Sequence, residues 1–235
     1  TQQSGQHVQL TGYNESLTGA RRWQARNGDV LAGIDVLEEQ KFLTLQALAN
    51  LLDAREHGTG RHSGRVREMA VILGRAMQLP PDALDTLAQG ALLHDIGKIA
   101  VPDAILLKAG PLDETEWTVM RTHPEVGFNI LRASPYLADV ADLVYSHQER
   151  FDGTGYPRGL KDGEICLGAR IFAIVDAYDA LRSDRPYRKA MSPYRAAAEI
   201  RQWSGRQFDP VVVEAFLGCQ ADIERAGKWS GGAGS

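Results

Sequence analysis

The sequence of 235 residues is poor in cysteine, having only Cys166 and Cys219. Two cysteines outside any Cys-x-x-Cys pair cannot form a disulfide framework, so we expect two reduced, buried thiols in a cytoplasmic protein. The chain also lacks any apolar run approaching the ~20 residues that a membrane helix needs. Its first residues lack the basic and apolar regions of a signal peptide. These absences favour a cytoplasmic protein without a membrane span.

Basic residues are not in excess, because 26 Lys and Arg stand against 30 Asp and Glu, for a formal net charge of -4. A protein that binds duplex nucleic acid usually presents a basic face, so we expect no DNA partner. A small anionic substrate is still compatible with this charge, since bound cations can supply positive charge locally.

The chain is expected to hold one domain with an appendage at each end. Residues 1–34 are rich in Gly, Gln, Ser, Thr and Asn, which indicates a linker or extension after an absent regulatory module. The first residue is Thr1, not Met, so we expect an excised fragment or a processed product. The domain itself is predicted over 35–223, followed by a flexible tail over 224–235 that ends in Gly and Ser.

Apolar residues recur at helical spacing through this domain, and alternating β-branched runs are nearly absent. Capping residues and first-turn prolines mark several helix starts: Asp113, Pro124, Ser192-Pro193 and Asp209-Pro210. The predicted helices cover 35–55, 62–78, a segment from Pro80-Pro81 toward His94, 113–122, 124–132, 137–148, 168–182, 193–203 and 210–217. The fold is therefore predicted to be all-α, with one Gly-rich interruption at 152–163.

Four of the six histidines stand at the ends of predicted helices: His62, His94, His123 and His147. The pair His94-Asp95 follows an apolar helix, where an unsatisfied polar pair is costly. Imidazole and carboxylate are natural ligands of divalent cations. Asp176 follows five apolar residues without a basic neighbour, and its burial would be expensive without a cation. Singly, each residue also fits a helix cap or a surface group, but the set indicates a two-metal site.

Five separated segments carry a family resemblance, and their order and spacing agree from about residue 40 to about residue 217. They are TGRHSGRV at 59–66, LHDIGKIAVP at 93–102, THPEVG at 122–127, HQERFDGTGYP at 147–157, and the stretch 173–188. The chain resembles the HD superfamily of metal-dependent phosphohydrolases and, within it, the HD-GYP subfamily. The resemblance implies an HD-domain helical bundle with a Gly-rich GYP loop.

The resemblance implies a cyclic di-GMP phosphodiesterase that releases linear pGpG, or GMP, in bacterial two-component signalling. A hydroxide bridging two divalent cations would attack the phosphorus. It also implies an upstream receiver or sensor domain and a GGDEF-type partner that docks on the GYP loop. The helix at 35–55 offers a surface for a homodimer.

By resemblance, the two cations would share Asp95. The first would be held by His62, His94, Asp95 and Asp176, and the second by Asp95, His123 and His147. These ligand types suit Fe, Mn or Zn alike. Lys98, one helical turn after His94, would contact the scissile phosphate and act with Asp95 in catalysis. An exposed lysine at a helix end is the alternative.

Two arginines, Arg185 and Arg188, match positions that contact substrate phosphate or guanine in the family, and a solvated basic turn is the alternative. Asp179 is predicted to belong to the substrate site, or to support a metal ligand, because it lies three residues after Asp176 on the same helix face. The GYP loop would be shaped by its glycines and proline. Its predicted residues are Asp152, Gly153, Gly155, Tyr156 and Pro157, with Asp152 and Tyr156 as orienting residues.

The sequence departs from the family at Gln148, where a second consecutive histidine usually ligates metal. An amide oxygen is a weaker ligand, so Gln148 is a doubtful one. Relatives with a third metal carry an acidic residue where this chain has Gly58, so we predict two metals. The alternatives to a cyclic di-GMP phosphodiesterase are a degenerate cyclic-dinucleotide sensor, a partner-docking module, or a hydrolase of another cyclic dinucleotide or nucleotide.

Overall fold

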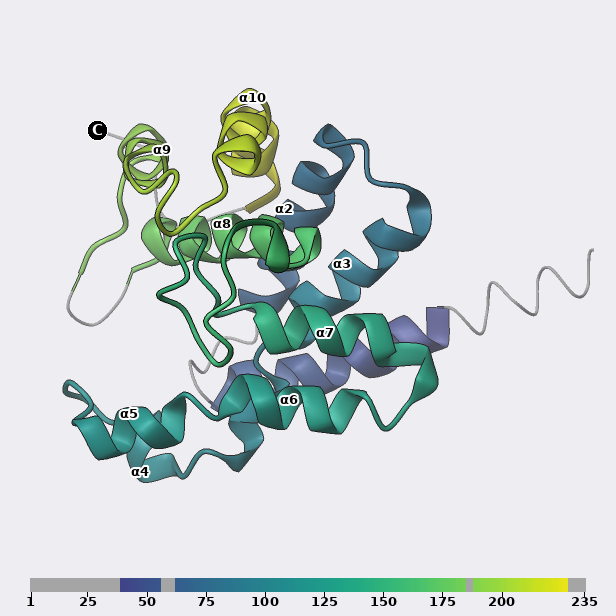
Figure 1. Ribbon diagram of the computed structural model, residues 1–235, viewed down its shortest axis with the longest axis vertical. Helices are drawn as coiled ribbons and strands as arrows, with labels where there is room; N and C mark the ends of the chain where they lie inside the picture. Colours follow the sequence, from purple (N-terminus) through teal and green to yellow (C-terminus); the bar gives the residue numbers. More distant parts are fainter. Residues whose placement is uncertain (1–38, 56–61, 185–187, 228–235) are drawn as a thin grey trace, which may run out of the picture. The chain divides into compact units, whose positions relative to one another are not determined.

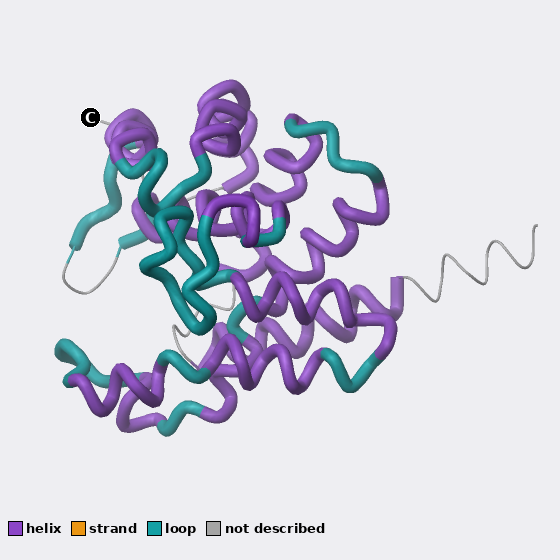
Figure 2. Tube along the Cα trace, viewed as in Figure 1, coloured by secondary structure: helices purple, strands orange, loops and turns teal. Residues whose placement is uncertain are grey.

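The computed structural model describes residues 39–55, 62–184 and 188–227. The chain divides into two units, Thr1–Thr44 and Leu45–Ser235. The described part of the first unit is 39–44, at the start of a helix that covers 39–55. Helices and loops make up the described ranges, which contain no strand beyond two isolated bridges (Figure 2). The predicted all-α fold is confirmed.

The second unit continues with nine α-helices and three short 3₁₀ helices in its described part. These are α2 (His62–Ala76), α3 (Pro81–Leu93), η1 (Ile96–Ala100), α4 (Asp103–Leu106), α5 (Glu114–Met120), α6 (His123–Leu131), η2 (Pro135–Leu137), α7 (Ala138–Ser146), η3 (Asp162–Glu164), α8 (Leu167–Arg182), α9 (Pro193–Gln202) and α10 (Pro210–Gly227). Each predicted helix of the described ranges is present. Among the described residues, the sequence pattern missed only α4 and the 3₁₀ turns, which are too short to show a periodicity.

Helix α8 is the centre of the core. It contacts α2, α3, α7, α9 and α10, and Figure 1 shows it between α7 on one side and α9 and α10 on the other. Apolar side chains therefore cover most of its circumference, and Phe172, Ile174 and Tyr178 are fully buried. A helix that packs against neighbours on most of its sides can fix the positions of polar groups that lie on it.

The last helix is longer than predicted. It continues to Gly227, so the predicted helix end at 217 and the predicted tail start at 224 are wrong. Ile223 is fully buried, and the carboxylate of Glu224 accepts hydrogen bonds from the Tyr178 hydroxyl at 2.7 Å and from Arg182 Nε at 3.1 Å. The extra turns are held by contacts with α8, which no local pattern could reveal.

The predicted helix starts are confirmed where the structure shows their caps. Asp113 accepts from the Glu116 backbone N–H at 2.9 Å, and the Glu116 side chain accepts in return from the Asp113 N–H at 2.8 Å. Asp209 likewise accepts from the Val211 N–H at 2.8 Å, at the start of α10. Such caps satisfy backbone donors that the first helical turn leaves unpaired.

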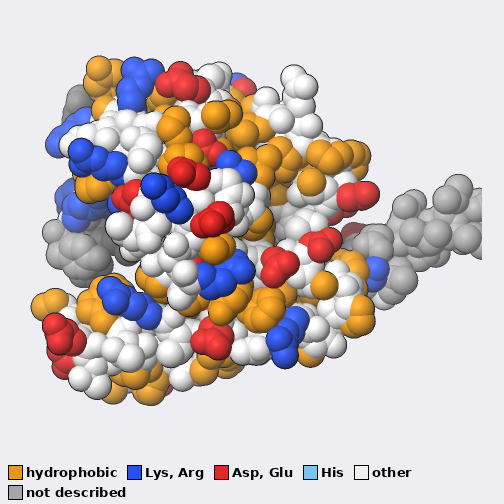
Figure 3. Space-filling view, in the orientation of Figure 1, with side chains coloured by type: hydrophobic (Ala, Val, Ile, Leu, Met, Phe, Trp, Pro, Cys, Tyr) orange, Lys and Arg blue, Asp and Glu red, His pale blue; other side chains and the backbone are white. Residues whose placement is uncertain are grey.

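The cysteines differ from expectation in one respect. Both are free thiols, but Cys166 is exposed and Cys219 is partly exposed, so the predicted burial is wrong. None of the helices in the described ranges combines the length and apolar character needed to cross a bilayer. On the face shown in Figure 3, Lys and Arg side chains are interspersed with Asp and Glu.

Candidate metal centre

Four histidines and one aspartate from different helix ends converge on one centre. His62 and His123 are the first residues of α2 and α6, whereas His94 and His147 directly follow α3 and α7. Their ligand atoms form two groups, each with all atoms within 4.8 Å of one another: His62, His94 and Asp95, and then Asp95, His123 and His147. Asp95 belongs to both groups, as a bridging ligand would.

The two carboxylate oxygens of Asp95 face different groups. Oδ2 lies 3.0 Å from His94 Nε2, whereas Oδ1 lies 3.6 Å from His123 Nε2 and 4.0 Å from His147 Nε2. The Nε2 atoms of His123 and His147 are 3.0 Å apart. Imidazole and carboxylate donors gathered this closely are a ligand set that fits two divalent cations.

Each of the four imidazoles is held through its Nδ1 atom, which leaves Nε2 directed at the centre. In three of them the partner is the main-chain carbonyl three residues earlier: Ala91 for His94 at 2.9 Å, Met120 for His123 at 2.8 Å, and Val144 for His147 at 2.6 Å. A carbonyl oxygen only accepts, so in the neutral imidazole Nδ1 carries the proton and Nε2 presents its lone pair. This is the tautomer that binds a metal.

His62 is held differently, by a carboxylate. Its Nδ1 lies 2.8 Å from Asp179 Oδ2, and Asp179 also accepts two hydrogen bonds from Arg65, at 2.7 and 2.9 Å. Burial alone would raise the pKa of Asp179, but the hydrogen bonds from His62 and Arg65 lower it to about 2. With 2% exposure and both oxygens bonded, Asp179 is not placed to contact substrate. This geometry corrects that expectation and matches the alternative of a support for His62.

Asp176 faces the same histidine from the other side. Its Oδ1 lies 3.4 Å from His62 Nε2, and its side chain is 33% exposed. The burial that we expected for this carboxylate is therefore wrong, since it lies at the wall of an open cavity. Asp176 is outside both three-residue groups, yet it can add an oxygen ligand beside His62.

Burial and charge shift the histidine pKa values of the two groups in opposite directions. Burial lowers the pKa of His94, but the Asp95 carboxylate outweighs it and raises the pKa to about 9. Burial lowers the pKa of His123. It also lowers the pKa of His147 far below its usual value, an effect that the neighbouring His123 reinforces. Burial works to raise the pKa of Asp95, yet His94 and Lys98 hold it well below its usual range.

Lys98 lies next to the bridging carboxylate, with its Nζ 2.9 Å from Asp95 Oδ2. Its turn, η1, is held by Arg55, which the sequence reasoning missed. Arg55 donates to the carbonyl of Lys98 at 3.0 Å and of Val101 at 2.7 Å, and forms an ion pair with Asp103 at 2.6 Å. These contacts span more than 40 residues, so no local signal indicates them.

The GYP loop is shaped as its glycines suggest. Gly153 has a φ of +82°, and a Cβ on Gly155 would lie 2.3 Å from the backbone nitrogen of Arg150. The Asp152 carboxylate orients the loop by accepting from the Thr154 N–H at 3.0 Å. Tyr156, before Pro157, brings its ring to 6.4 Å from that of His123. The loop therefore forms a wall of the centre.

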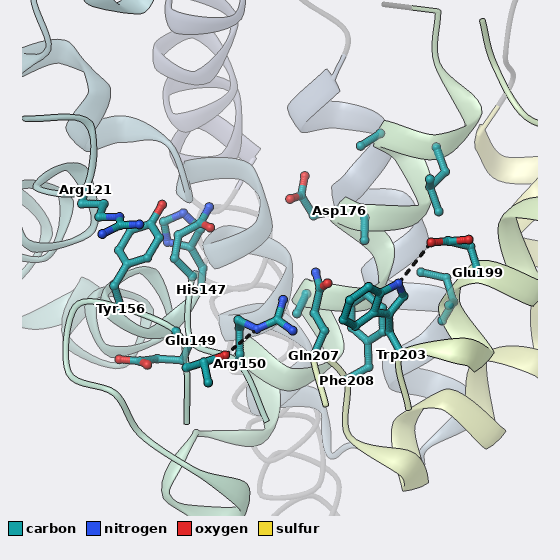
Figure 4. Close-up of a pocket in the computed structure, with 18 of the residues that line it drawn as sticks. Arg121, His147, Glu149, Arg150, Tyr156, Asp176, Glu199, Trp203, Gln207 and Phe208 are labelled. Atoms are coloured by element: carbon teal, nitrogen blue, oxygen red, sulfur yellow. Dashed lines mark hydrogen bonds between the residues drawn. The ribbon is translucent and has the colours of Figure 1, made fainter. Parts of the chain in front are cut away.

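A cavity of about 730 Å³ opens beside the centre, lined by residues including Arg121, His147, Gln148, Tyr156, Asp176, Arg188 and Trp203. Figure 4 shows His147, Tyr156 and Arg121 on one side and Trp203 and Glu199 on the other. Gln148 and Arg188 thus line the cavity as candidate contacts, whereas Arg185 lies outside the described residues. Ligand cavities are usually of this size, roughly 300–1,000 Å³.

A protein-family model described as an HD domain matches residues 46–212. The chain belongs to the HD domain family, as its motifs predicted. It is 38% identical over 198 residues to a cyclic di-GMP phosphodiesterase response regulator of Xanthomonas campestris, which covers 83% of this chain and 52% of that protein. It is also 38% identical over 186 residues to a 3'3'-cGAMP-specific phosphodiesterase of Vibrio cholerae, covering 78% and 35%.

The fold is also that of a solved structure, a cyclic GMP-AMP specific phosphodiesterase of V. cholerae. That structure aligns with a TM-score of 0.58 and 20% identity, over 79% of this chain and 52% of the other. At this identity the likeness shows the fold alone. The chain spans about half the length, or less, of the curated relatives described above.

Proposed function

We propose that the protein is a metal-dependent phosphodiesterase that hydrolyses cyclic di-GMP to linear pGpG. The observation that carries the proposal is the shared carboxylate, Asp95, with one oxygen toward each ligand group. Such a carboxylate could be shared by two cations, as in two-metal hydrolysis of phosphoesters. The names of relatives at 38% identity support the substrate class.

The residues of the chain divide the work between binding and orientation. His62, His94, Asp95 and Asp176 would hold one cation, and Asp95, His123 and His147 the other. Bound divalent cations would supply Lewis-acid charge and lower the pKa of an attacking water. Lys98, at the edge of this centre, would contact a scissile phosphoryl oxygen. The Tyr156 hydroxyl, whose pKa burial and Asp95 raise to about 12, stays protonated and can donate a hydrogen bond.

Further parts of the proposal rest on the family resemblance. Arg188 would contact substrate phosphate or guanine, as would Arg185. The protein would act in the cytoplasm downstream of a receiver or sensor domain, pair as a homodimer, and meet a GGDEF-type partner at the GYP loop. The cations would number two, chosen from Fe, Mn and Zn.

The test is turnover with defined metals. The protein, loaded with Mn²⁺ or Fe²⁺, is incubated with cyclic di-GMP and, in parallel, with 3'3'-cGAMP, and the products are resolved by chromatography. We expect pGpG from cyclic di-GMP and no product from the H94A/D95A variant. Faster cleavage of 3'3'-cGAMP would transfer the proposal to that substrate. Binding without product would instead indicate a sensor with a defective second site at Gln148.

Metal content provides a separate check. Elemental analysis of anaerobically purified protein is expected to give close to two metals per chain. A ratio near three would contradict the two-metal proposal, whatever the turnover.

A further inference from the structure

We infer that Arg121 binds the phosphate of the cyclic dinucleotide that is not being cleaved. The inference rests on the proposed function, because it concerns the same cavity and the same substrate. A cyclic dinucleotide carries two phosphodiester groups. The metal ions and Lys98 would bind the scissile phosphate. The second phosphate therefore calls for a different positively charged side chain within the cavity.

Arg121 is positioned at the edge of the metal centre. It caps the C-terminal end of α5 and precedes His123 by two residues. Its guanidinium carbon lies 5.6 Å from the ring centroid of Trp117 and 5.6 Å from that of Tyr156. All three residues line the cavity, and Figure 4 shows Arg121 beside Tyr156 near His147. Two aromatic rings thus hold the guanidinium in place without consuming its N–H groups.

Among the described residues that line the cavity, two other arginines use side-chain donors in hydrogen bonds within the protein. Arg150 donates to Thr154 at 2.9 Å and faces Asp152 at 3.5 Å, and Arg188 donates to the Ala180 carbonyl at 2.6 Å. Within the described ranges, the Arg121 side chain makes neither a hydrogen bond nor an ion pair, and its backbone N–H donates to the Trp117 carbonyl at 2.9 Å. Its planar fork of five N–H donors is therefore available for the oxygens of a phosphate, which it matches in geometry.

Arg121 is separate from the chemistry at the cations. Arg121 belongs to neither ligand group. The ring of Tyr156 contacts Arg121 on one side and lies near His123 on the other. The expected role is substrate binding at a second phosphate, with little effect on a phosphodiester that has only one. This difference makes the inference testable with two substrates.

The test compares Arg121→Ala and Arg121→Lys with a matched control, Arg132→Ala. Arg132 also caps a helix and covers an aromatic ring, Phe128, at 5.4 Å, but it does not line the cavity. The substrates are cyclic di-GMP and bis(p-nitrophenyl) phosphate, a diester with a single phosphate. Thermal unfolding of each variant shows whether it folds.

For Arg121→Ala we expect the ratio of kcat/KM for cyclic di-GMP to that for bis(p-nitrophenyl) phosphate to fall about 10- to 100-fold, mainly through KM, as for a lost charge-assisted hydrogen bond. Arg121→Lys, which keeps the charge but loses the fork, should fall between. Arg132→Ala should keep the wild-type ratio. An unchanged ratio in Arg121→Ala, or an equal loss on both substrates, would overturn the inference.

Calorimetric binding separates this inference from the proposed function. If the wild type binds cyclic di-GMP but does not cleave it, the proposed enzymatic activity is wrong. The binding affinities of the variants for cyclic di-GMP still test the role of Arg121. Weaker binding by Arg121→Ala and Arg121→Lys would then support the inference, and equal binding would refute it. If the wild type does not bind cyclic di-GMP, both proposals fall.

Discussion

The two ligand groups that share Asp95 are supported in different ways. In the first group, His62 is fixed by the carboxylate of Asp179 and faces a second carboxylate, Asp176. In the second, both histidines, His123 and His147, are fixed by main-chain carbonyls, as His94 is in the first group. An imidazole that is hydrogen-bonded to a carboxylate is a stronger metal ligand than an imidazole that is hydrogen-bonded to a carbonyl. The first group should therefore bind its cation more tightly.

The largest effect is expected from Asp95→Asn, which removes the ligand common to both groups. Because Asp95 is the carboxylate common to both groups, we expect both cations to be lost and turnover to fall about 1,000-fold or more. Metal analysis and kcat check this, with the exposed Asp139→Asn as a control. Retention of one cation at full affinity would show that the groups are independent.

Gly97→Ala tests the junction between the groups. A Cβ here would lie 1.9 Å from the His123 carbonyl oxygen and 2.5 Å from the Gly127 nitrogen, whereas a Cβ on Gly110 would meet no atom within 4 Å. We expect Gly97→Ala to lower the free energy of unfolding by about 1–3 kcal/mol and to weaken the second group by moving Asp95 away from His123. Denaturant unfolding compares it with Gly110→Ala, and equal stability of the two variants would contradict this packing.

Asp179→Asn probes the first group alone. The amide cannot replace the charge that His62 and Arg65 share, so we expect metal affinity of the first group to drop about 10- to 100-fold. The second group should change little. Metal titration of the variant, beside Asp139→Asn, measures this. If only the second group lost metal affinity, the idea that Asp179 strengthens the first group would be contradicted.

The smallest change is expected from Gln148→His, which adds an imidazole at the cavity wall next to His147. We expect tighter binding at the second group, by about tenfold, and faster turnover, because imidazole is the better ligand. Stepwise metal titration and kcat test it. If neither improves, Gln148 is already an adequate ligand or the second group does not use this position.

Much of the centre was accessible from sequence because its ligands stand at helix ends. Periodicity and capping residues located the starts of α2 and α6 and the ends of α3 and α7, where the four histidines lie. The motif spacing also selected Asp95, Lys98 and Asp176. Asp179 was assigned to the substrate site with ligand support as an alternative, and only its burial between His62 and Arg65 distinguishes the two.

The sequence by itself determined the all-α class, the helix positions and the identity of the metal-ligand candidates, because each depends on a local pattern or a short motif. The tertiary structure alone decided how Asp95 divides its oxygens between two groups, how Arg55 fixes the turn of Lys98, and how Arg121 enters the cavity beside Tyr156. Those contacts join residues from distant helices. They are set by the packing of α8 and its neighbours, on which periodicity along one helix carries no information.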